Sequence, residues 1–320
     1  MISASSSQIS IIIQGAPSAN LDLTKKLNSL RKLLPDAQVI ISTWKHSNLE
    51  PVNLFDLIES DDPGYFIAGS GQISNVNRLI VSTREGLNLA TRPYALKLRF
   101  DTDIDEKILH FCRLDLRPSE GDFSIFKSRL RITNVFTRDA EKTPYLFHPS
   151  DMVMFGLTED LRDYWASPLA APSDLLSFYE ERLDQPIQVW VGPGEFKLVP
   201  EQWILLSALS RKLDLGMIIS TRHSLSYEAF LISSKSLLHN FELVDHEQSG
   251  VVFPQRFIAN VESRRTVLDA RKFNSLLERS EWGWRVGFVR AVIAKAGVAI
   301  KEIFLGKKFL KSNRSRHDLA

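Results

Sequence analysis

Hydrophobic and polar residues in the first part of the chain alternate between the spacing of strands and that of helices. Residues 8–13 and 37–42 are short apolar runs rich in β-branched side chains, which is typical of buried strands. Between them, residues 21–34 carry leucines at the spacing of one helix face, at Leu23, Leu27, Leu30 and Leu34. A strand, a helix and a second strand form a βαβ unit, which predicts a parallel sheet.

A second helix with a polar face is predicted over residues 74–87. Ser74 is expected to cap its amino-terminal end. Asn75, Arg78 and Ser82 recur at the helical spacing, so we expect them on one face. This face could contact a ligand, or it could be an ordinary solvated surface on which Arg78 pairs with a nearby acid.

An alternating strand that ends in two carboxylates follows this helix. Apolar and polar residues alternate over residues 94–100, which predicts a strand with Lys97 and Arg99 on the same side. Two buried cations need anionic partners, which could be phosphate or nearby aspartates. Asp101 and Asp103 come directly after the strand, and two carboxylates this close favour a divalent cation that carries a diphosphate. The alternative is a polar strand end followed by a helix cap.

The strand ends and the polar helix face are expected to meet in one crevice, because the carboxyl ends of parallel strands share an edge of the sheet. Residues 8–115 would then form a nucleotide-binding half, whose candidate contacts are Gln14, Gly15, Trp44, Asn75, Arg78, Lys97 and Arg99. The first turn has one glycine where a dinucleotide fingerprint needs three, and the sequence contains no P-loop. Gln14 and Gly15 could also form an ordinary turn, and Trp44 could pack in the core.

The rest of the chain predicts further strands and helices. Strands are expected over residues 129–135 and 241–244, and an apolar strand pair over residues 145–156. Helices are expected over residues 158–165, 173–183, 200–213, 223–238 and 286–310, with a tight loop over residues 191–194. Together with the βαβ unit, this pattern predicts an α/β protein.

Several short stretches in this order resemble one protein family, and they are residues 9–15, 41–45, 62–64, 75–78, 94–103, 147–151, 155–156 and 200–202. Their order and content resemble the WavE lipopolysaccharide synthesis family over residues 8–245. The resemblance implies a GT-A-like fold, a Rossmann-type mixed sheet flanked by helices, with a nucleotide-sugar-binding half (8–115) and an acceptor half (116–245). It also implies that Asp101 and Asp103 are a D-x-D motif that binds Mn²⁺ or Mg²⁺ at the donor diphosphate.

Three residues of the acceptor half are candidates for the general base that would deprotonate an attacking sugar hydroxyl. His148 could be this base or a core histidine, and Asp151 could be this base or the cap of a turn. Glu201 lies in the first turn of a predicted helix, where it could act as the base or complement the helix dipole. The sequence does not choose among them. His223 and His246 are further candidate metal ligands.

The charge distribution sets the end of the chain apart. The chain has a net charge of +2, but residues 283–320 carry a surplus of seven positive charges. Residues 246–320 are therefore predicted to form a helical, basic, membrane-proximal extension that meets an anionic membrane surface through residues 282–316. The alternative is a solvated basic helix. Nucleic acid is a weaker candidate because the segment has no known nucleic-acid-reading motif.

Three further features indicate the compartment. Cys112 is the only cysteine, which excludes a disulfide framework or a cysteine zinc site and favours a reducing compartment. The first residues lack the charge and apolar core of a signal peptide, and no run approaches the roughly 20 apolar residues that span a bilayer. We therefore expect a cytoplasmic protein that is peripheral on the inner face of the cytoplasmic membrane.

These observations predict a metal-assisted glycosyltransferase that moves a sugar from a nucleotide-sugar donor to a lipid-linked or lipopolysaccharide core oligosaccharide. Two alternatives stay open. One is a nucleotidyl- or sugar-phosphate transferase of envelope polysaccharide synthesis, which would use the same crevice. The other is a non-catalytic, membrane-docked assembly partner.

Overall fold

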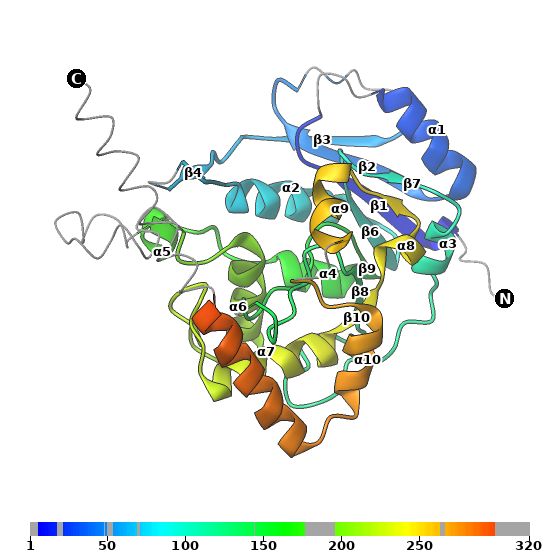
Figure 1. Ribbon diagram of the computed structural model, residues 1–320. Coiled ribbons are helices and arrows are strands. Elements are labelled where there is room, and N and C mark those ends of the chain that lie inside the picture. Colours follow the sequence, from blue (N-terminus) through cyan, green and yellow to red (C-terminus); the bar gives the residue numbers. More distant parts are fainter. Residues whose placement is uncertain are drawn as a thin grey trace, which may run out of the picture.

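A mixed seven-stranded sheet forms the centre of the computed structural model, with strand order β10-β8-β9-β6-β1-β2-β3 (Figure 1). The structure describes residues 6–17, 22–47, 49, 54–68, 71–143, 145–176, 196–262 and 266–297. The strands are β1 (Ile9–Gln14), β2 (Gln38–Trp44), β3 (Asp56–Ser60), β6 (Tyr94–Arg99), β8 (Leu130–Thr133), β9 (Met154–Leu157) and β10 (Phe241–Val244). β9 runs antiparallel to its neighbours β6 and β8, and the other neighbouring pairs are parallel.

Helices cover both faces of this sheet (Figure 1). They are α1 (Leu23–Leu33), α2 (Val76–Leu89), α3 (Ile108–Phe111), α4 (Thr158–Trp165), α5 (Pro172–Leu176), α6 (Pro200–Leu213), α7 (Tyr227–Asn240), α8 (His246–Ser249), α9 (Gln255–Glu262), α10 (Ala270–Leu277) and a helix over residues 281–297. A short 3-10 helix (Ser6–Gln8) precedes β1, and two small antiparallel pairs complete the described elements: β4 (Phe66–Ile67) with β5 (Ile73–Ser74), and β7 (Asp103–Ile104) with β11 (Val251–Val252). This is the GT-A-like α/β architecture expected from the sequence.

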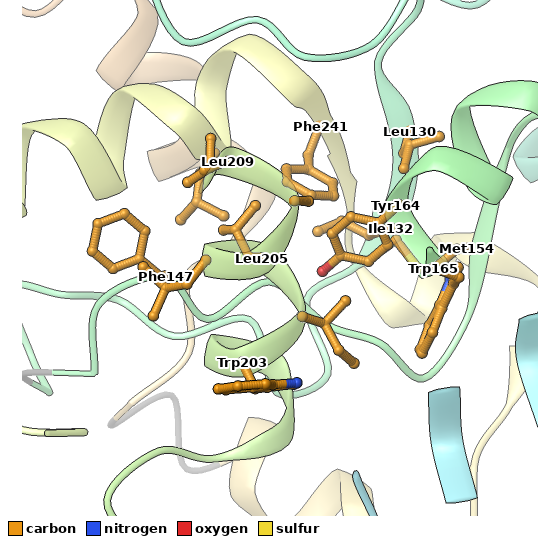
Figure 2. Close-up of a cluster of buried hydrophobic side chains, with 14 of the residues drawn as sticks. Leu130, Ile132, Phe147, Met154, Tyr164, Trp165, Trp203, Leu205, Leu209 and Phe241 are labelled. Carbon is orange, nitrogen blue, oxygen red and sulfur yellow. The ribbon is translucent and has the colours of Figure 1, made fainter. Parts of the chain in front are cut away.

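The alternation along β1 divides the interior into two cores. Ile11 and Ile13 pack with α1, α3 and α9, whereas Ile12 faces the core formed with α2, α4, α6 and α7. Figure 2 shows part of the second core, where Leu205 and Leu209 of α6 lie beside Phe241 and Tyr164. Burying an aliphatic or aromatic side chain of this kind contributes about 1.5–3 kcal/mol, so both faces of the sheet help to fix its strand ends.

Helix α2 lies close to the sheet because Gly86 faces it. A Cβ atom at Gly86 would lie 2.6 Å from Cγ2 of Ile12 and 3.1 Å from Cβ of Ser42. The absence of a side chain therefore lets the helix backbone approach β1 and β2. This close packing positions the polar amino-terminal end of α2 beside the carboxyl ends of those strands.

Most of the predicted elements are confirmed, and two differ. The helix over residues 74–87 begins at Val76, with Asn75 rather than Ser74 as its N-cap residue, because Ser74 belongs to β5. Within residues 145–156 the structure has one sheet strand, β9, which begins at Met154, instead of a strand pair. The edge strand β3 was not predicted. The loop predicted over residues 191–194 and parts of the helices predicted over residues 173–183 and 286–310 lie outside the described residues.

The described residues after 245 pack against the rest of the protein. β11 pairs with β7, and Phe253, Val261 and Val267 belong to the core that contains β1. Trp284 and Ala291 belong to the other core. The predicted boundary at residue 245 therefore does not coincide with a break in packing.

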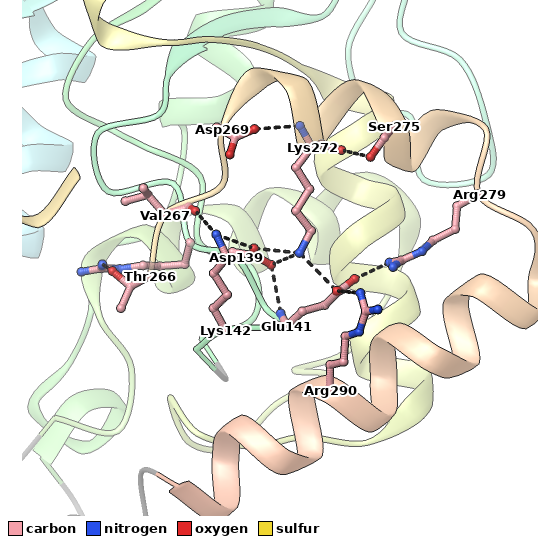
Figure 3. A network of polar contacts seen from close by, with 11 residues as sticks. Asp139, Glu141, Lys142, Thr266, Val267, Asp269, Lys272, Ser275, Arg279 and Arg290 are labelled. Carbon is pink, nitrogen blue, oxygen red and sulfur yellow. Dashed lines mark hydrogen bonds and ion pairs between the residues drawn. The ribbon is translucent and has the colours of Figure 1, made fainter. Parts of the chain in front are cut away.

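A buried ionic network reinforces this attachment (Figure 3). The carboxylate of Glu141 contacts Lys272 of α10 at 3.1 Å and Arg290 at 3.3 Å, and it also accepts a hydrogen bond from Arg279. Burial alone would raise the pKa of Glu141, but Arg279 and Lys272 outweigh burial and lower it. A carboxylate with 5% of its side chain exposed thus joins α10 and the helix over residues 281–297 to the body.

Among the described residues, no helix is both long enough and apolar enough to cross a membrane.

Candidate functional site

A crevice of about 530 Å³ opens at the carboxyl ends of β1, β2 and β6, beside the first turn of α2. Its lining residues are Gln14, Gly15, Ala16, Trp44, Asp62, Asn75, Arg78, Leu79, Ser82, Arg99, Phe100, Asp101 and Arg256. Of the residues predicted to contact a nucleotide, all except Lys97 line it. The geometric expectation that three strand ends and one helix face converge is therefore confirmed, while the ligand contacts themselves stay predictions.

The first strand end brings backbone close to the open crevice. Gly15 has a φ of +108°, which favours glycine, and a Cβ there would meet nothing within 4 Å. Its N–H donates to the carbonyl of Ser42 at 3.1 Å, which joins the turn to the end of β2. The side chain of Gln14 accepts a hydrogen bond from the hydroxyl of Ser82 on α2 at 2.7 Å. These contacts fix the strand end and the polar helix face relative to each other.

Arg78 projects from α2 and is held on several sides. Its Nε donates to Oδ1 of Asp62 at 2.7 Å, and its Nη1 donates to Asn75 at 3.1 Å. The guanidinium also lies 4.9 Å from the centre of the Tyr65 ring. The hydrogen bond from Arg78 lowers the pKa of Asp62, so this pair stays ionised.

Asp101 is held by two arginines. Nε and Nη2 of Arg99 donate to its two carboxylate oxygens at 2.8 and 2.9 Å. Nη2 of Arg256, which comes from α9, donates to Oδ2 at 2.7 Å. Burial would raise the pKa of Asp101, but the bonds and charges of both arginines outweigh burial and lower it. The carboxylate is therefore ionised and its two oxygens already have cationic partners.

Asp103 has different surroundings from Asp101. It belongs to β7, its side chain is 70% exposed, and its Oδ1 lies 3.4 Å from Nζ of Lys26 on α1. It is not among the residues that line the crevice. Within the part of the chain that the structure describes, no three His, Cys, Asp or Glu side chains are grouped to hold a metal ion, and this includes the candidates His223 and His246. The arrangement of the D-x-D carboxylates thus does not fit a shared cation, and the metal site stays a prediction.

Lys97 lies on the same side of β6 as Arg99. It is two residues before Arg99, and therefore roughly 7 Å further from the carboxyl end of the strand. Its side chain is fully buried; Nζ donates to the backbone carbonyl of Asp151 and lies 5.0 Å from the ring of Trp165. Burial lowers its pKa to about 8, against the opposing charge of Asp151. Lys97 therefore connects the floor of the crevice to the backbone at Asp151 rather than lining the crevice itself.

The three candidate bases lie together behind Lys97. Glu201 lies in the first turn of α6, and its Oε2 lies 3.6 Å from Nε2 of His148. Burial, together with the charge of Asp151, raises the pKa of Glu201 to about 8. Burial and the charge of Arg138 lower the pKa of His148 to about 3, so its imidazole is neutral at ordinary pH. Asp151 is 4% exposed, whereas the side chain of Glu201 keeps 15% of its surface exposed.

The crevice and the buried cluster are electrostatically connected. The charges of Asp151 and Glu201 both act on Arg99, which lines the crevice. Asp101 and Glu201 both act on Lys97. An anion bound near Arg99 would thus lie beside a cluster that contains two carboxylates, one of them with a pKa suited to proton transfer.

The chain matches the family model described as WavE lipopolysaccharide synthesis over residues 9–307. The chain belongs to the WavE lipopolysaccharide synthesis family. The WavE match extends past residue 245 and includes α9, α10 and the helix over residues 281–297. No curated protein shows significant sequence similarity to the chain. Membership in the WavE family implies a part in lipopolysaccharide synthesis.

Two charged residues of the crevice were not predicted as site residues. The sequence indicates only a turn at Asp62, and Arg256 lies in the segment that is predicted to be a membrane-proximal extension. Arg256 is 155 positions from Asp101, and the short β7–β11 pair precedes the helix that carries it. The sequence around Arg256 contains no local pattern that indicates a ligand site. The acid Asp62 could have been paired with Arg78 from the proximity of turn and helix alone.

Proposed function

We propose that this WavE family member is a glycosyltransferase that transfers a sugar from a nucleotide-sugar donor to a lipid-linked or lipopolysaccharide core oligosaccharide. The observation that carries the proposal is the juxtaposition of the two sites: an arginine-containing crevice at the strand ends and a carboxylate cluster behind it. The first supplies contacts for a nucleoside diphosphate, and the second supplies a base for the acceptor. Membership in a lipopolysaccharide synthesis family supports the class of acceptor.

On the donor side, Trp44 would stack on the base or the sugar, and the Gln14–Gly15 turn would let backbone approach the ligand. Arg78 and Arg99 would bind diphosphate oxygens, since a guanidinium offers a rigid fork of donors. Neutralising the charge that develops on the leaving diphosphate lowers the barrier for sugar transfer. Since the carboxylates at this edge do not fit a shared cation, no step here is assigned to a metal.

On the acceptor side, Glu201 is the best of the three candidate bases for an inverting transfer. A general base works best when its pKa is close to the working pH, which favours Glu201 at about 8 over His148 at about 3. Glu201 is also more exposed than Asp151. Asp151 would raise the basicity of Glu201 through its charge.

We also propose that the protein docks on an anionic bilayer that presents the lipid-linked acceptor. The helix over residues 281–297 exposes Trp282, Val289, Val292 and Ile293, which recur at helical spacing on one face. The sequence that follows this helix along the chain is rich in Lys and Arg, including Lys307, Lys308 and Lys311. Apolar side chains beside a basic segment suit the interface of an anionic membrane.

A thermal-shift screen of nucleotide sugars tests the proposed function. A donor at a hundredfold excess over its Kd stabilises the folded protein by about 2.7 kcal/mol, so its melting temperature should rise clearly. The product released from the stabilising donor then identifies the reaction. A nucleoside diphosphate supports glycosyl transfer, whereas a nucleoside monophosphate or pyrophosphate would indicate a sugar-phosphate or nucleotidyl transferase instead. A screen in which no nucleotide sugar raises the melting temperature would contradict the proposal and favour a non-catalytic partner.

A further inference from the structure

The charged residues that line the crevice are three arginines and two aspartates, so its lining carries a net positive charge. Asp62 and Asp101 each accept hydrogen bonds from at least one of these arginines. A guanidinium has five N–H donors, so it can hold a carboxylate and still donate to a phosphate oxygen. The aspartates therefore orient the arginines without removing their ability to bind an anion.

The ring of Phe257 gives Arg99 and Arg256 a second support. The guanidinium of Arg256 lies 4.6 Å from the ring centre, and that of Arg99 lies 5.5 Å from it. Both cations are thus fixed by the Asp101 carboxylate and by an aromatic face. This resembles the support of Arg78 by Asp62 and Tyr65. Cations that are oriented before binding lose less conformational entropy when a ligand arrives.

Asp101 is better placed to position these arginines than to bind a metal. Arg99 engages both of its oxygens and Arg256 engages one of them again, so a cation at this carboxylate would have to displace bonds from two guanidiniums. The second carboxylate of the motif, Asp103, lies beside Lys26 and outside the crevice lining. The positive charge available to a diphosphate at this edge is therefore that of the arginines.

We propose that Arg78, Arg99 and Arg256 bind the diphosphate of the donor directly, in the role that a divalent cation has in metal-dependent relatives of this architecture. Arg256 completes the site from α9, and Asp101 is a positioning residue for Arg99 and Arg256. The proposal rests on the proposed function, because it names how the donor is held. Its ligand class is a nucleoside diphosphate, free or sugar-linked.

Calorimetric titration of the full chain with UDP, GDP, CDP and ADP, in EDTA and in Mn²⁺, tests this proposal. We expect at least one nucleotide to bind in EDTA, with an affinity close to that in Mn²⁺. Arg256→Gln should weaken that binding roughly 10- to 100-fold, because it removes a charge-assisted hydrogen bond. Arg256→Lys should restore part of the loss, because it keeps the charge without the fork.

Two variants serve as comparisons. Arg271→Gln removes an exposed arginine from the neighbouring helix α10 and should leave the affinity unchanged. Asp103→Asn should also leave it unchanged, whereas a D-x-D metal site would lose binding. The Arg256 side chain is 66% exposed, and an exposed ion pair adds little stability, so Arg256→Gln should fold normally and melt as the unmodified protein does.

The possible failures are distinguishable. Nucleotide binding that requires Mn²⁺ and is lost in Asp103→Asn would overturn the arginine site while leaving the proposed function intact. Binding in EDTA that Arg256→Gln does not weaken would also overturn it. If neither a nucleoside diphosphate nor a nucleotide sugar binds under any of these conditions, the proposed function fails and the arginine site fails with it.

Discussion

Glu201 shows how burial prepares a single residue for chemistry. It sits in the first turn of α6, where an acid ordinarily complements the helix dipole. Here burial and the nearby Asp151 raise its pKa to about 8, so it is mostly protonated at neutral pH. A base of this kind becomes active as the pH rises, and it returns its proton readily once the reaction is over.

We therefore expect the rate of sugar transfer to rise with pH through about 8 and then to level off. Glu201→Gln should lower the rate at least ~100-fold and abolish this pH dependence, since Gln cannot accept the proton. The measurement is release of nucleoside diphosphate from the identified donor across the pH range.

Asp151→Asn is the companion variant. It removes the charge that raises the pKa of Glu201, so the rise of the transfer rate should move to lower pH. Unchanged turnover in Glu201→Gln would exclude Glu201 as the base.

The same residue also predicts a stability change with pH. Because the folded-state pKa of Glu201 is raised above 4.5, its protonated form stabilises the fold fully below about pH 4.5, and this contribution is lost as the pH rises to about 8. Gln keeps the neutral form at every pH. The melting temperature of Glu201→Gln relative to the unmodified protein should therefore increase between about pH 5 and pH 9. A difference that stays constant over this range would mean that Glu201 does not titrate there.

Residues at the ends of strands could be predicted from the sequence, whereas roles that depend on burial or on tertiary partners could not. Gln14, Trp44 and Arg99 were predicted because each ends a strand, and the ends of parallel strands must meet at one edge. Asp103 was paired with Asp101 because of a two-residue spacing, but the chain turns after Arg99 and the two side chains find different partners. The choice of Glu201 over His148 needed their burial, which no local pattern contains.

At the scale of elements, α2 connects packing to the site. Gly86 sets its distance from the sheet, and its first turn carries Arg78 into the crevice. Gly86→Ala would normally stabilise a helix, but the added methyl group would overlap Ile12. We expect a net loss of about 1–3 kcal/mol in the free energy of unfolding, measured by urea denaturation, together with weaker nucleotide binding.

Gly297 provides the matched control for this prediction. It also lies in a helix, but a Cβ there would meet nothing within 4 Å. Gly297→Ala should therefore leave the stability unchanged or increase it by up to about 1 kcal/mol. If Gly86→Ala were as stable as Gly297→Ala, the close approach of α2 to the sheet would not be what positions this helix.

Elements with a strong periodicity were predictable, and those fixed by tertiary contacts were not. The helix over residues 200–213 and the strand over residues 241–244 were predicted with the observed bounds. β3 was not predicted because it contains acidic residues and has no run of β-branched side chains, as expected for a strand at the exposed edge of the sheet. The segment before β9 looked apolar enough for a strand, but its backbone bonds to side chains instead, as in the hydrogen bond from Ser150 N–H to the Thr137 hydroxyl.

At the scale of the whole molecule, the described part of the segment after residue 245 has an inward and an outward face. One face packs inward: Trp284 and Ala291 are buried, and Arg279 and Arg290 bind Glu141 (Figure 3). The outward face of the helix over residues 281–297 carries exposed apolar side chains, Trp282, Val289, Val292 and Ile293, together with the exposed Arg285. Charge and hydropathy predicted a membrane-proximal helix here, but they could not show that the same segment supplies Arg256 to the crevice, because that depends on strand pairing far along the chain.

The outward face predicts how the protein meets a bilayer. Val289 and Ile293 are 55% and 66% exposed, so replacing both with Ser should cost little stability, whereas deleting the helix would remove buried Trp284. We expect the chain to co-sediment with vesicles that contain phosphatidylglycerol, and the double variant to bind them more weakly because apolar burial in the interface is lost. Each Lys or Arg near the surface adds about 1 kcal/mol, so binding should also fall with added salt.

The control is Leu109→Ser, which removes an exposed apolar side chain from α3, outside this helix, and should leave vesicle binding unchanged. If the double variant bound the vesicles as well as the unmodified protein does, the contact would be made by the basic segment alone. If the unmodified protein bound uncharged vesicles as well as anionic ones, an anionic partner would be contradicted.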